Sequence, residues 1–373
     1  MSTITLTENT TYSTLMILDD DVIDLAGYLL TIDSEPGETG ISITSPGTAG
    51  TVTLSGGYDL SSWSMTAGTG NLVNTIPAGT VLGSATGGAG TGICCYNNYG
   101  TITTSTGGSG THARGCYANY GTITTCVAGT GSNARGCYYN YSGAIITTCT
   151  GGSGATSGCY TNYAGGIITT CTGGTTISAV GCAINYGTIT TCTGGSGIGT
   201  AGCTVNYSGG TITTCTGGTN TNANGCYYNY GVITTCTGGD SANAAYGCSV
   251  NYHTITLCTG GSGTGNTTHG CNTNQGLVVT AVGASAGSAA FGIRYNYGYV
   301  WNITDTTRLA VDIWYSPTVF VFGAGIVGEI KAPVATIYSF GAMNAGATLP
   351  VGATVTTLST GIGLVFAGSL TGG

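Results

Sequence analysis

The chain has 373 residues, of which 70 are glycine, and only 5% are charged, with a formal net charge of −8 at pH 7. Disordered chains combine high charge with low hydrophobicity, whereas this chain has 41% hydrophobic residues, so we expect an ordered fold rich in turns. The glycines follow no Gly-X-Y period, which excludes collagen. Binding to nucleic acid needs clustered Lys and Arg. Only five such residues are present, so we predict no nucleic-acid partner.

Residues 1–90 form the predicted N-terminal segment and carry most of the acidic side chains. Residues 13–33 alternate apolar runs with an acidic turn, which predicts the start of a β-helix. Four acids form one cluster: Asp19, Asp20, Asp21 and Asp24. Their oxygens are suitable ligands for calcium. A solvated turn that caps the helix is the interpretation we favour.

Charge nearly disappears after this segment. Between residues 60 and 300 the ionic side chains are Arg114, Arg135, Asp240 and Arg294. A surface without charge lacks the repulsion that keeps proteins apart, so we expect the chain to assemble with itself. Met1–Glu8 has neither a basic nor an apolar stretch, so no signal peptide is visible. No run of about 18 apolar residues predicts a membrane span.

One unit is repeated through residues 91–304: Gly-Cys-x-x-Asn-Tyr, a short link, then Ile-Thr-Thr-Cys-Thr-Gly-Gly. The first cysteines of successive units lie 21 to 23 residues apart. Self-similarity at such a period is typical of solenoids. We therefore predict an all-β fold, a parallel β-helix with one repeat per coil. Taking the second cysteine as reference extends the register from Ala85 to Ile303.

Three columns, each made of one kind of residue, run through these repeats. An aliphatic column extends from Ile102 to Val300 without a polar interruption, which predicts a core position. A tyrosine column follows the asparagines and is interrupted by Gln275. Asparagine suits turns, and its amide can bond the amide of the next coil. We expect such a ladder from these residues: Asn119, Asn140, Asn162, Asn185, Asn206, Asn229 and Asn251.

The chain has 17 cysteines, and most of them form two further columns. The first column includes Cys116, Cys137, Cys159, Cys182, Cys203, Cys226 and Cys248. The second consists of Cys126, Cys149, Cys171, Cys192, Cys215, Cys236 and Cys258. We expect disulfides within a coil, as in Cys116–Cys126. A scheme shifted by one coil, as in Cys126–Cys137, and a buried ladder of free thiols are alternatives.

Three cysteines at the ends of this region remain unpaired in the within-coil scheme: Cys94, Cys95 and Cys271. We predict that they link subunits end to end. The direction of the cysteines depends on the backbone, because side chains alternate faces along a straight strand. Ile and Cys three residues apart would then point opposite ways. We favour a bend within Ile-Thr-Thr-Cys that turns both side chains inward. The alternative is a straight strand whose cysteine column faces outward.

The string Asn-Tyr-Gly-Thr-Ile-Thr-Thr-Cys-x-x-Gly resembles the GLUG-type repeat of large bacterial and archaeal surface adhesins, over about residues 92–304. This resemblance implies a β-solenoid stalk on a cell-surface or secreted protein. The recurrent Thr-Cys-Thr, as at 148–150, is similar to the coils of insect antifreeze proteins. There, cysteines point inward and paired threonines form a flat array.

Groups that commonly perform catalysis are scarce in the repeats. Paired carboxylates, the usual requirement for glycoside cleavage, are absent from residues 91–304, which contain Asp240 alone. We expect His112, His253 and His269 to be surface residues, and the spacing of Cys and His matches no zinc site. We therefore predict no catalytic residue, metal or cofactor. Residues 305–373 contain β-like runs and are expected to form a cap or an assembly surface.

The interpretation we favour is a non-enzymatic structural subunit of an extracellular filament, sheath, surface coat or virion fibre. Regular repeats and scarce charge support it. An adhesin or viral receptor-binding fibre is an alternative, and it predicts an aromatic-rich tip. An ice-binding protein is another, and it predicts a flat outward face with two threonine columns.

Overall fold

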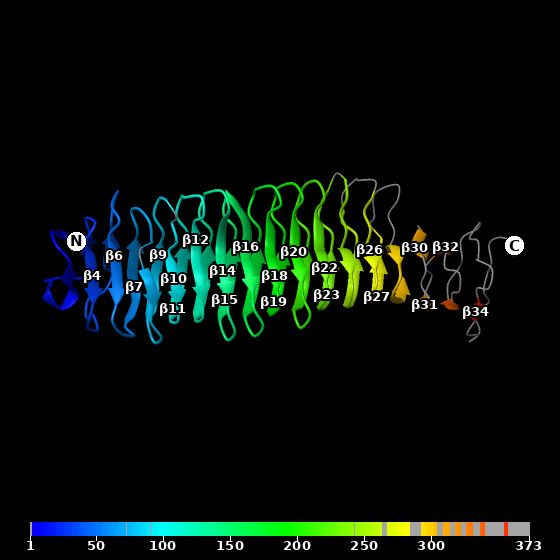
Figure 1. Cartoon of the computed structure of the whole chain (residues 1–373), viewed down its shortest axis with the longest axis horizontal. Coiled ribbons are helices and arrows are strands. Elements are labelled where there is room, and N and C mark those ends of the chain that lie inside the picture. The colour runs from blue at the N-terminus through cyan, green and yellow to red at the C-terminus, as the bar shows by residue number, and fades with distance from the viewer. Residues whose placement is uncertain are drawn as a thin grey trace. The chain divides into compact units, whose positions relative to one another are not determined.

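The computed structural model describes residues 2–71, 73–90, 92–241, 243–262, 267–283 and 292–303, together with five short strands nearer the C-terminus. It confirms the predicted fold class, because the described chain is an all-β parallel solenoid (Figure 1). The chain forms two compact units, Met1–Thr190 and Thr191–Gly373. Each is described by itself below.

Unit 1 winds between two parallel sheets, and each coil contributes one strand to each. Sheet A contains β1 (Thr3–Thr5), β3 (Val22–Asp24), β5 (Ser42–Thr44), β7 (Asp59–Thr66), β9 (Val81–Thr86), β11 (Thr101–Thr106), β13 (Thr122–Val127), β15 (Ile145–Thr150) and β17 (Ile167–Thr172). Sheet B contains β2 (Thr10–Thr11), β4 (Leu29–Ile32), β6 (Thr51–Leu54), β8 (Val73–Ile76), β10 (Cys95–Asn98), β12 (Arg114–Asn119), β14 (Ala134–Asn140), β16 (Ala155–Asn162) and β18 (Val180–Asn185). A 3-10 turn, η1 (Tyr12–Thr14), lies in the first coil.

Unit 2 repeats this arrangement, and β19 (Thr188–Thr193) spans the boundary between the units. Its sheet A contains β21 (Thr211–Thr216), β23 (Val232–Thr237), β25 (Thr254–Thr259), β27 (Leu277–Val282) and β29 (Tyr299–Ile303). Its sheet B contains β20 (Ala201–Asn206), β22 (Asn224–Asn229), β24 (Cys248–Asn251), β26 (Cys271–Asn274), β28 (Ile293–Asn296), β30 (Leu309–Ile313) and β32 (Ile326–Ile330). A third sheet joins β31 (Thr318–Val321), β33 (Thr336–Ser339) and β34 (Thr354–Thr356).

The register of the coils follows the repeat. In sheet A, Ile102 pairs with Ile123, and Ser105 pairs with Cys126, the position assigned to it from the sequence. In sheet B, Asn98 pairs with Asn119. Equivalent residues of successive coils therefore lie side by side, about 4.8 Å apart across the strands.

The burial pattern of the repeat strands in sheet A indicates a bend that turns both hydrophobic positions inward, as favoured from the sequence. Ile123 and Cys126 of β13 are both fully buried, while Thr124 between them is exposed and Thr125 is half-buried. A straight strand would alternate buried and exposed residues. The bend thus places isoleucine and cysteine in one core and leaves the threonines outside.

Glycine is required where coils approach each other most closely. A Cβ atom on Gly129 would lie 1.7 Å from the carbonyl oxygen of Gly108, and one on Gly218 would lie 1.8 Å from that of Gly195. The Thr-Gly-Gly corner of the repeat therefore stacks backbone directly on backbone. The longer links at the opposite corner use Gly143, whose φ of 79° few other residues adopt.

Candidate functional site

The asparagine column forms a continuous amide ladder inside each unit. In unit 1, Asn119 Nδ2 donates to Asn140 Oδ1 at 2.9 Å, and Asn140 Nδ2 donates to Asn162 Oδ1 at 2.8 Å. Asn162 continues the ladder to Asn185 at 2.9 Å. In unit 2 the same bonds join Asn206, Asn229, Asn251, Asn274 and Asn296. Each amide between two others, such as Asn140, both donates and accepts, so the interior of this buried polar column is satisfied.

The ladder of unit 1 starts at Asn98. This side chain donates to Asn119 Oδ1 at 2.8 Å, but its own Oδ1 is buried and has no donor. The preceding coil has Ile76 at the paired position, which cannot supply an N–H group. The ladder therefore runs in one direction, with an unsatisfied acceptor at its first member.

The two cysteine columns lie inside the coils, and all 17 cysteines are buried and outside any disulfide. Each second-column thiol for which a bond is described donates to the carbonyl of the glycine that precedes the next first-column cysteine. Cys149 Sγ, for example, lies 3.2 Å from Gly158 O, and Cys236 Sγ lies 2.9 Å from Gly247 O. The column thus forms weak hydrogen bonds that link one sheet to the other.

The expected within-coil disulfides are therefore not formed, and this prediction is corrected. Across the core, the described thiol contacts join cysteines of the shifted scheme, such as Cys126 with Cys137 and Cys149 with Cys159. The reason is that Cys126 faces the Gly136 carbonyl, which brings it to the coil that follows rather than to Cys116. Of the three alternatives, the structure has the buried cysteine ladder without disulfides.

Cys94, Cys95 and Cys271, the predicted links between subunits, are also fully buried. Burial raises the pKa of the Cys94 thiol to about 12, and the neighbouring Cys95 adds to this effect. A buried and protonated thiol is a poor nucleophile. A bond to another subunit would require the coil to open.

The outer side of sheet A is an array of threonines, which we call the threonine face. It consists of three columns, one following each buried isoleucine and two flanking each buried cysteine. In unit 1 its members are Thr103, Thr104, Thr106, Thr124, Thr125, Val127, Thr147, Thr148, Thr150, Thr169, Thr170 and Thr172. In unit 2 they include Thr213, Thr214, Thr216, Thr234, Thr235, Thr237, Thr256, Leu257 and Thr259. All are exposed or half-buried.

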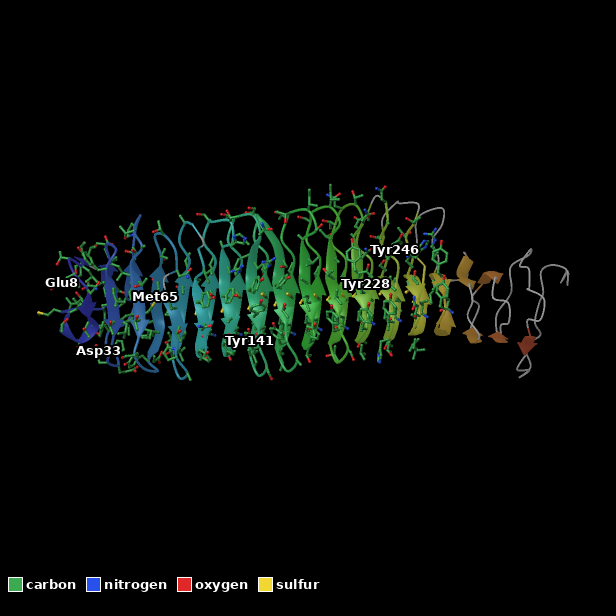
Figure 2. All side chains as sticks on the ribbon, viewed as in Figure 1. Glu8, Asp33, Met65, Tyr141, Tyr228 and Tyr246 are labelled. Atoms are coloured by element: carbon green, nitrogen blue, oxygen red, sulfur yellow. The ribbon has the colours of Figure 1, made fainter. Side chains whose placement is uncertain are left out.

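The tyrosines that follow the asparagines stack along the outside of the coils, where Tyr141 is labelled in Figure 2. Tyr120 lies 4.7 Å from Tyr99 and 4.4 Å from Tyr141 between ring centroids, and the rings are nearly parallel. In unit 2, Tyr230 and Tyr252 stack at 4.5 Å. Because the ring faces cover each other, the column presents ring edges and hydroxyl groups to the outside.

A second stack occupies the outer side of sheet B in unit 1: Tyr96, Tyr117, Tyr138 and Tyr160. It is joined by two arginines of the same sheet, Arg114 and Arg135. Sequence reasoning treated these arginines only as isolated charges. Their common place in the repeat, two residues before the first cysteine, was the available signal.

The acidic cluster binds backbone groups of the first coils. Asp21 accepts N–H groups from Ser2 at 2.7 Å and Leu18 at 3.1 Å, and these bonds lower the pKa of its carboxyl group. Asp19 accepts the N–H of Thr39 at 2.7 Å. These contacts are those of turn caps. The described residues include no group of three or more His, Cys, Asp or Glu side chains arranged to hold a metal ion.

The three histidines do not share one environment. His112 and His253 are exposed, as expected, but His269 is fully buried, so its predicted surface position is wrong. Its ring stacks on Tyr246, which is labelled in Figure 2, with 5.4 Å between centroids. Burial, with a smaller effect of Arg294, lowers the pKa of His269 to about 4. It is therefore neutral near pH 7 and packs as an aromatic ring.

Comparisons of this chain with protein-family models, curated proteins and solved structures find no match. The resemblance to GLUG-type repeats and to antifreeze coils thus rests on the motifs alone, while the stacked parallel strands are compatible with β-helix repeat proteins in general. None of the described segments forms a helix that could cross a membrane.

Proposed function

We propose that the protein is a non-enzymatic structural subunit that assembles with other copies of itself through the threonine face. The observation that carries this proposal is the repetition of one short residue pattern along that face, without an ionic side chain among its members. A surface of this kind offers no single reactive pocket. It offers the same contact many times.

Two threonine faces match each other geometrically. Both have the strand spacing of a sheet, about 4.8 Å, so each row of one face can meet a row of the other. Threonine methyl groups can interdigitate between flat sheets, as side chains do in steric zippers. No charge opposes the approach, because the flanking repeats contain so few ionic groups.

The test places charge on the face and measures assembly. Thr148→Lys with Thr170→Lys adds two positive charges to neighbouring coils of unit 1, whose threonines pair with each other in the sheet. We expect wild-type protein to form regular polymers in electron micrographs and fast-sedimenting species in the ultracentrifuge. The doubly substituted protein should sediment as a monomer.

A matched control adds the same charge elsewhere on the same coils. Ser142 and Ala164 are exposed residues of the links between the sheets, away from the threonine face. Ser142→Lys with Ala164→Lys should leave the polymers intact. Wild-type protein that stays monomeric at high concentration would refute the proposal, as would equal loss of assembly in both variants.

Ice binding is a second candidate, favoured by one specific observation. In β15 and β17 the cysteine of Thr-Cys-Thr is buried, and the flanking threonines are half-exposed in aligned columns. This is the outward array that the antifreeze resemblance implies. Thermal hysteresis decides between the two candidates. Hysteresis that wild-type monomers show and that Thr148→Tyr abolishes would favour ice binding, and its absence would leave the structural role.

The adhesin alternative has less support, because the described tyrosine stacks follow successive coils and are not confined to a tip. We propose the location that the sequence predicts: outside the cell, on its surface or on a virion. Immunogold labelling of intact source material should then decorate a surface, whereas labelling confined to the cytoplasm would contradict this location.

A further inference from the structure

Two arginines of unit 1 lie side by side on the outer surface of sheet B. Arg114 of β12 and Arg135 of β14 are direct partners in the parallel ladder. Neighbouring strands are separated by about 4.8 Å, so the two side chains leave the backbone at that spacing. Like charges at adjacent positions of a sheet repel each other. A pair of this kind therefore needs a compensating group.

Tyrosine rings fix the orientation of both guanidinium groups. Arg114 Cζ lies 4.2 Å from the centroid of Tyr138, and Arg135 Cζ lies 4.3 Å from that of Tyr160. Each also contacts a second ring, Tyr117 for Arg114 at 5.1 Å and Tyr138 for Arg135 at 4.9 Å. A guanidinium that stacks through its face keeps its in-plane N–H groups for another partner.

Those N–H groups find no partner within the part of the chain that the structure describes. The Nε atoms of both arginines are buried without an acceptor, and no described hydrogen bond or ion pair involves either side chain. The sequence contains no Asp or Glu between residues 60 and 239. Burial and the charge of Arg135 lower the pKa of Arg114, a sign that its positive charge is poorly compensated.

We propose that Arg114 and Arg135 form a binding site for a phosphate group, held between the two guanidinium groups and framed by the stacked tyrosines. Two positive charges favour a dianion, and a phosphate monoester carries about 1.5 to 2 negative charges at pH 7, while inorganic phosphate is largely a dianion above that pH. The planar fork of arginine matches phosphate oxygens through paired hydrogen bonds. A single carboxylate would neutralise only one of the two charges. This site is independent of the threonine face.

The experiment is a calorimetric titration of the full chain with inorganic phosphate at low ionic strength. Arg114→Gln and Arg135→Gln should each lower the affinity about 10- to 100-fold, the value of a lost charge-assisted hydrogen bond. The double variant should not bind. Arg114→Lys with Arg135→Lys should bind phosphate more weakly than wild type but more tightly than the double glutamine variant, because lysine keeps the charge but not the planar, stacked guanidinium group.

Arg294 provides the matched control. It also lies against a tyrosine, 4.7 Å from the ring of Tyr295, but among the described residues no second arginine is paired with it across the strands. Arg294→Gln should therefore leave phosphate affinity unchanged. Near-ultraviolet circular dichroism confirms that each variant keeps its tyrosine stacks, so a loss of binding is separated from a loss of fold.

The charge of the ligand is tested with pH and with other anions. Lowering the pH from about 8 to about 5 converts inorganic phosphate from mostly dianion to monoanion, because its second pKa is about 7, and should weaken its binding. Inorganic sulfate should bind equally at both values, and acetate at least 10-fold more weakly. Wild-type protein that does not bind phosphate, or a double glutamine variant that binds it as well as wild type, overturns the proposal. Equal binding of acetate also overturns it.

Discussion

The first coils of unit 1 and the repeat coils that follow them have the same backbone arrangement but differ in the side chains that form their cores. Residues 23–82 bury large side chains of several types, including Trp63, Leu60 and Met65. From Cys95 to Asn185 the interior holds small residues and one isoleucine column, together with the buried asparagine amides. A parallel coil can therefore be filled by varied large residues or by a few small ones repeated in register.

The two kinds of core depend on different forces. In the first coils, stability comes from burying large apolar surface, about 25 cal/mol for each Å². In the repeat coils, part of the interior is polar, and each asparagine has to meet the amide of the next coil. A shift of register would leave those amides unsatisfied. The repeat coils therefore have less freedom to change sequence but a more strictly defined register.

Alkaline pH should produce the largest difference in stability between the first coils and the repeat coils. Burial raises the pKa of Cys94 from 9.0 to about 12, and it raises that of Cys116 as well. Above pH 9 the unfolded chain ionises Cys94 and Cys116, while the folded chain keeps these two thiols protonated. Stability present below pH 9 is then lost towards pH 12, by about 1.4 kcal/mol for each thiol and pH unit.

Hydrogen–deuterium exchange measured by mass spectrometry at rising pH checks this expectation. Peptides from residues 95–185 should open at a lower pH than peptides from residues 2–90, which contain no cysteine. Cys94→Ala should shift the opening to higher pH. Thiol reagents should modify few cysteines of the folded protein and all 17 after unfolding. Simultaneous opening of both regions would contradict the distinction between them.

The repeat coils were also the part whose fold could be predicted from sequence. Fixed spacing predicted the solenoid and the position of Ala85, which the structure pairs with Ser105, and of Ala281, which it pairs with Cys258. Periodic sequences show register because each column repeats one residue type. In the first coils, residue types vary from coil to coil, so the sequence indicated strands without their partners.

Other features depended on geometry that spacing does not contain. The bend between Ile123 and Cys126 decides which way the thiols face, and it is evident from the burial pattern of the strand. The neighbours of Cys126 across the core depend on where the next coil returns. Arg114 and Arg135 can be recognised as a pair only when the pairing of β12 with β14 is known, because it places them side by side. On the thiol direction and the cysteine neighbours the sequence left alternatives open, and the arginine pair was missed.

A cavity in the first coils should cost more than one in the repeat coils. Trp63 is 1% exposed, its indole N–H donates to the Glu38 carbonyl at 3.0 Å, and its ring lies 5.5 Å from Tyr12. Trp63→Ala should lower the free energy of unfolding by about 3–5 kcal/mol. The matched change Cys149→Ala removes one sulfur atom and should cost roughly 1 kcal/mol. Denaturant titration measures both, and similar values would contradict the contrast between the two cores.

Interrupting the amide ladder should have an intermediate effect. Asn140→Ala removes a donor and an acceptor at once, so the amides of Asn119 and Asn162 each lose a partner. We expect a loss of about 2–4 kcal/mol, since each unsatisfied buried group costs about 1–3 kcal/mol. Asn98→Ala at the start of the ladder removes one such bond and should cost about half as much. Equal losses at both positions would show that the ladder bonds do not determine the cost.

The tyrosine stack on the outside should give the smallest effect. Tyr120 contacts the rings of two neighbours, Tyr99 and Tyr141, whereas the described ring contact of Tyr252 is with Tyr230 alone, because Gln275 follows it in the column. An aromatic pair is worth about 0.5–1.5 kcal/mol, so Tyr120→Ala should cost about 1–2 kcal/mol and Tyr252→Ala about half of that. Thermal unfolding measures the difference. If both substitutions left stability unchanged, the stacked rings would be a consequence of the coil register, and the asparagine ladder alone would distinguish the repeat coils from the first ones.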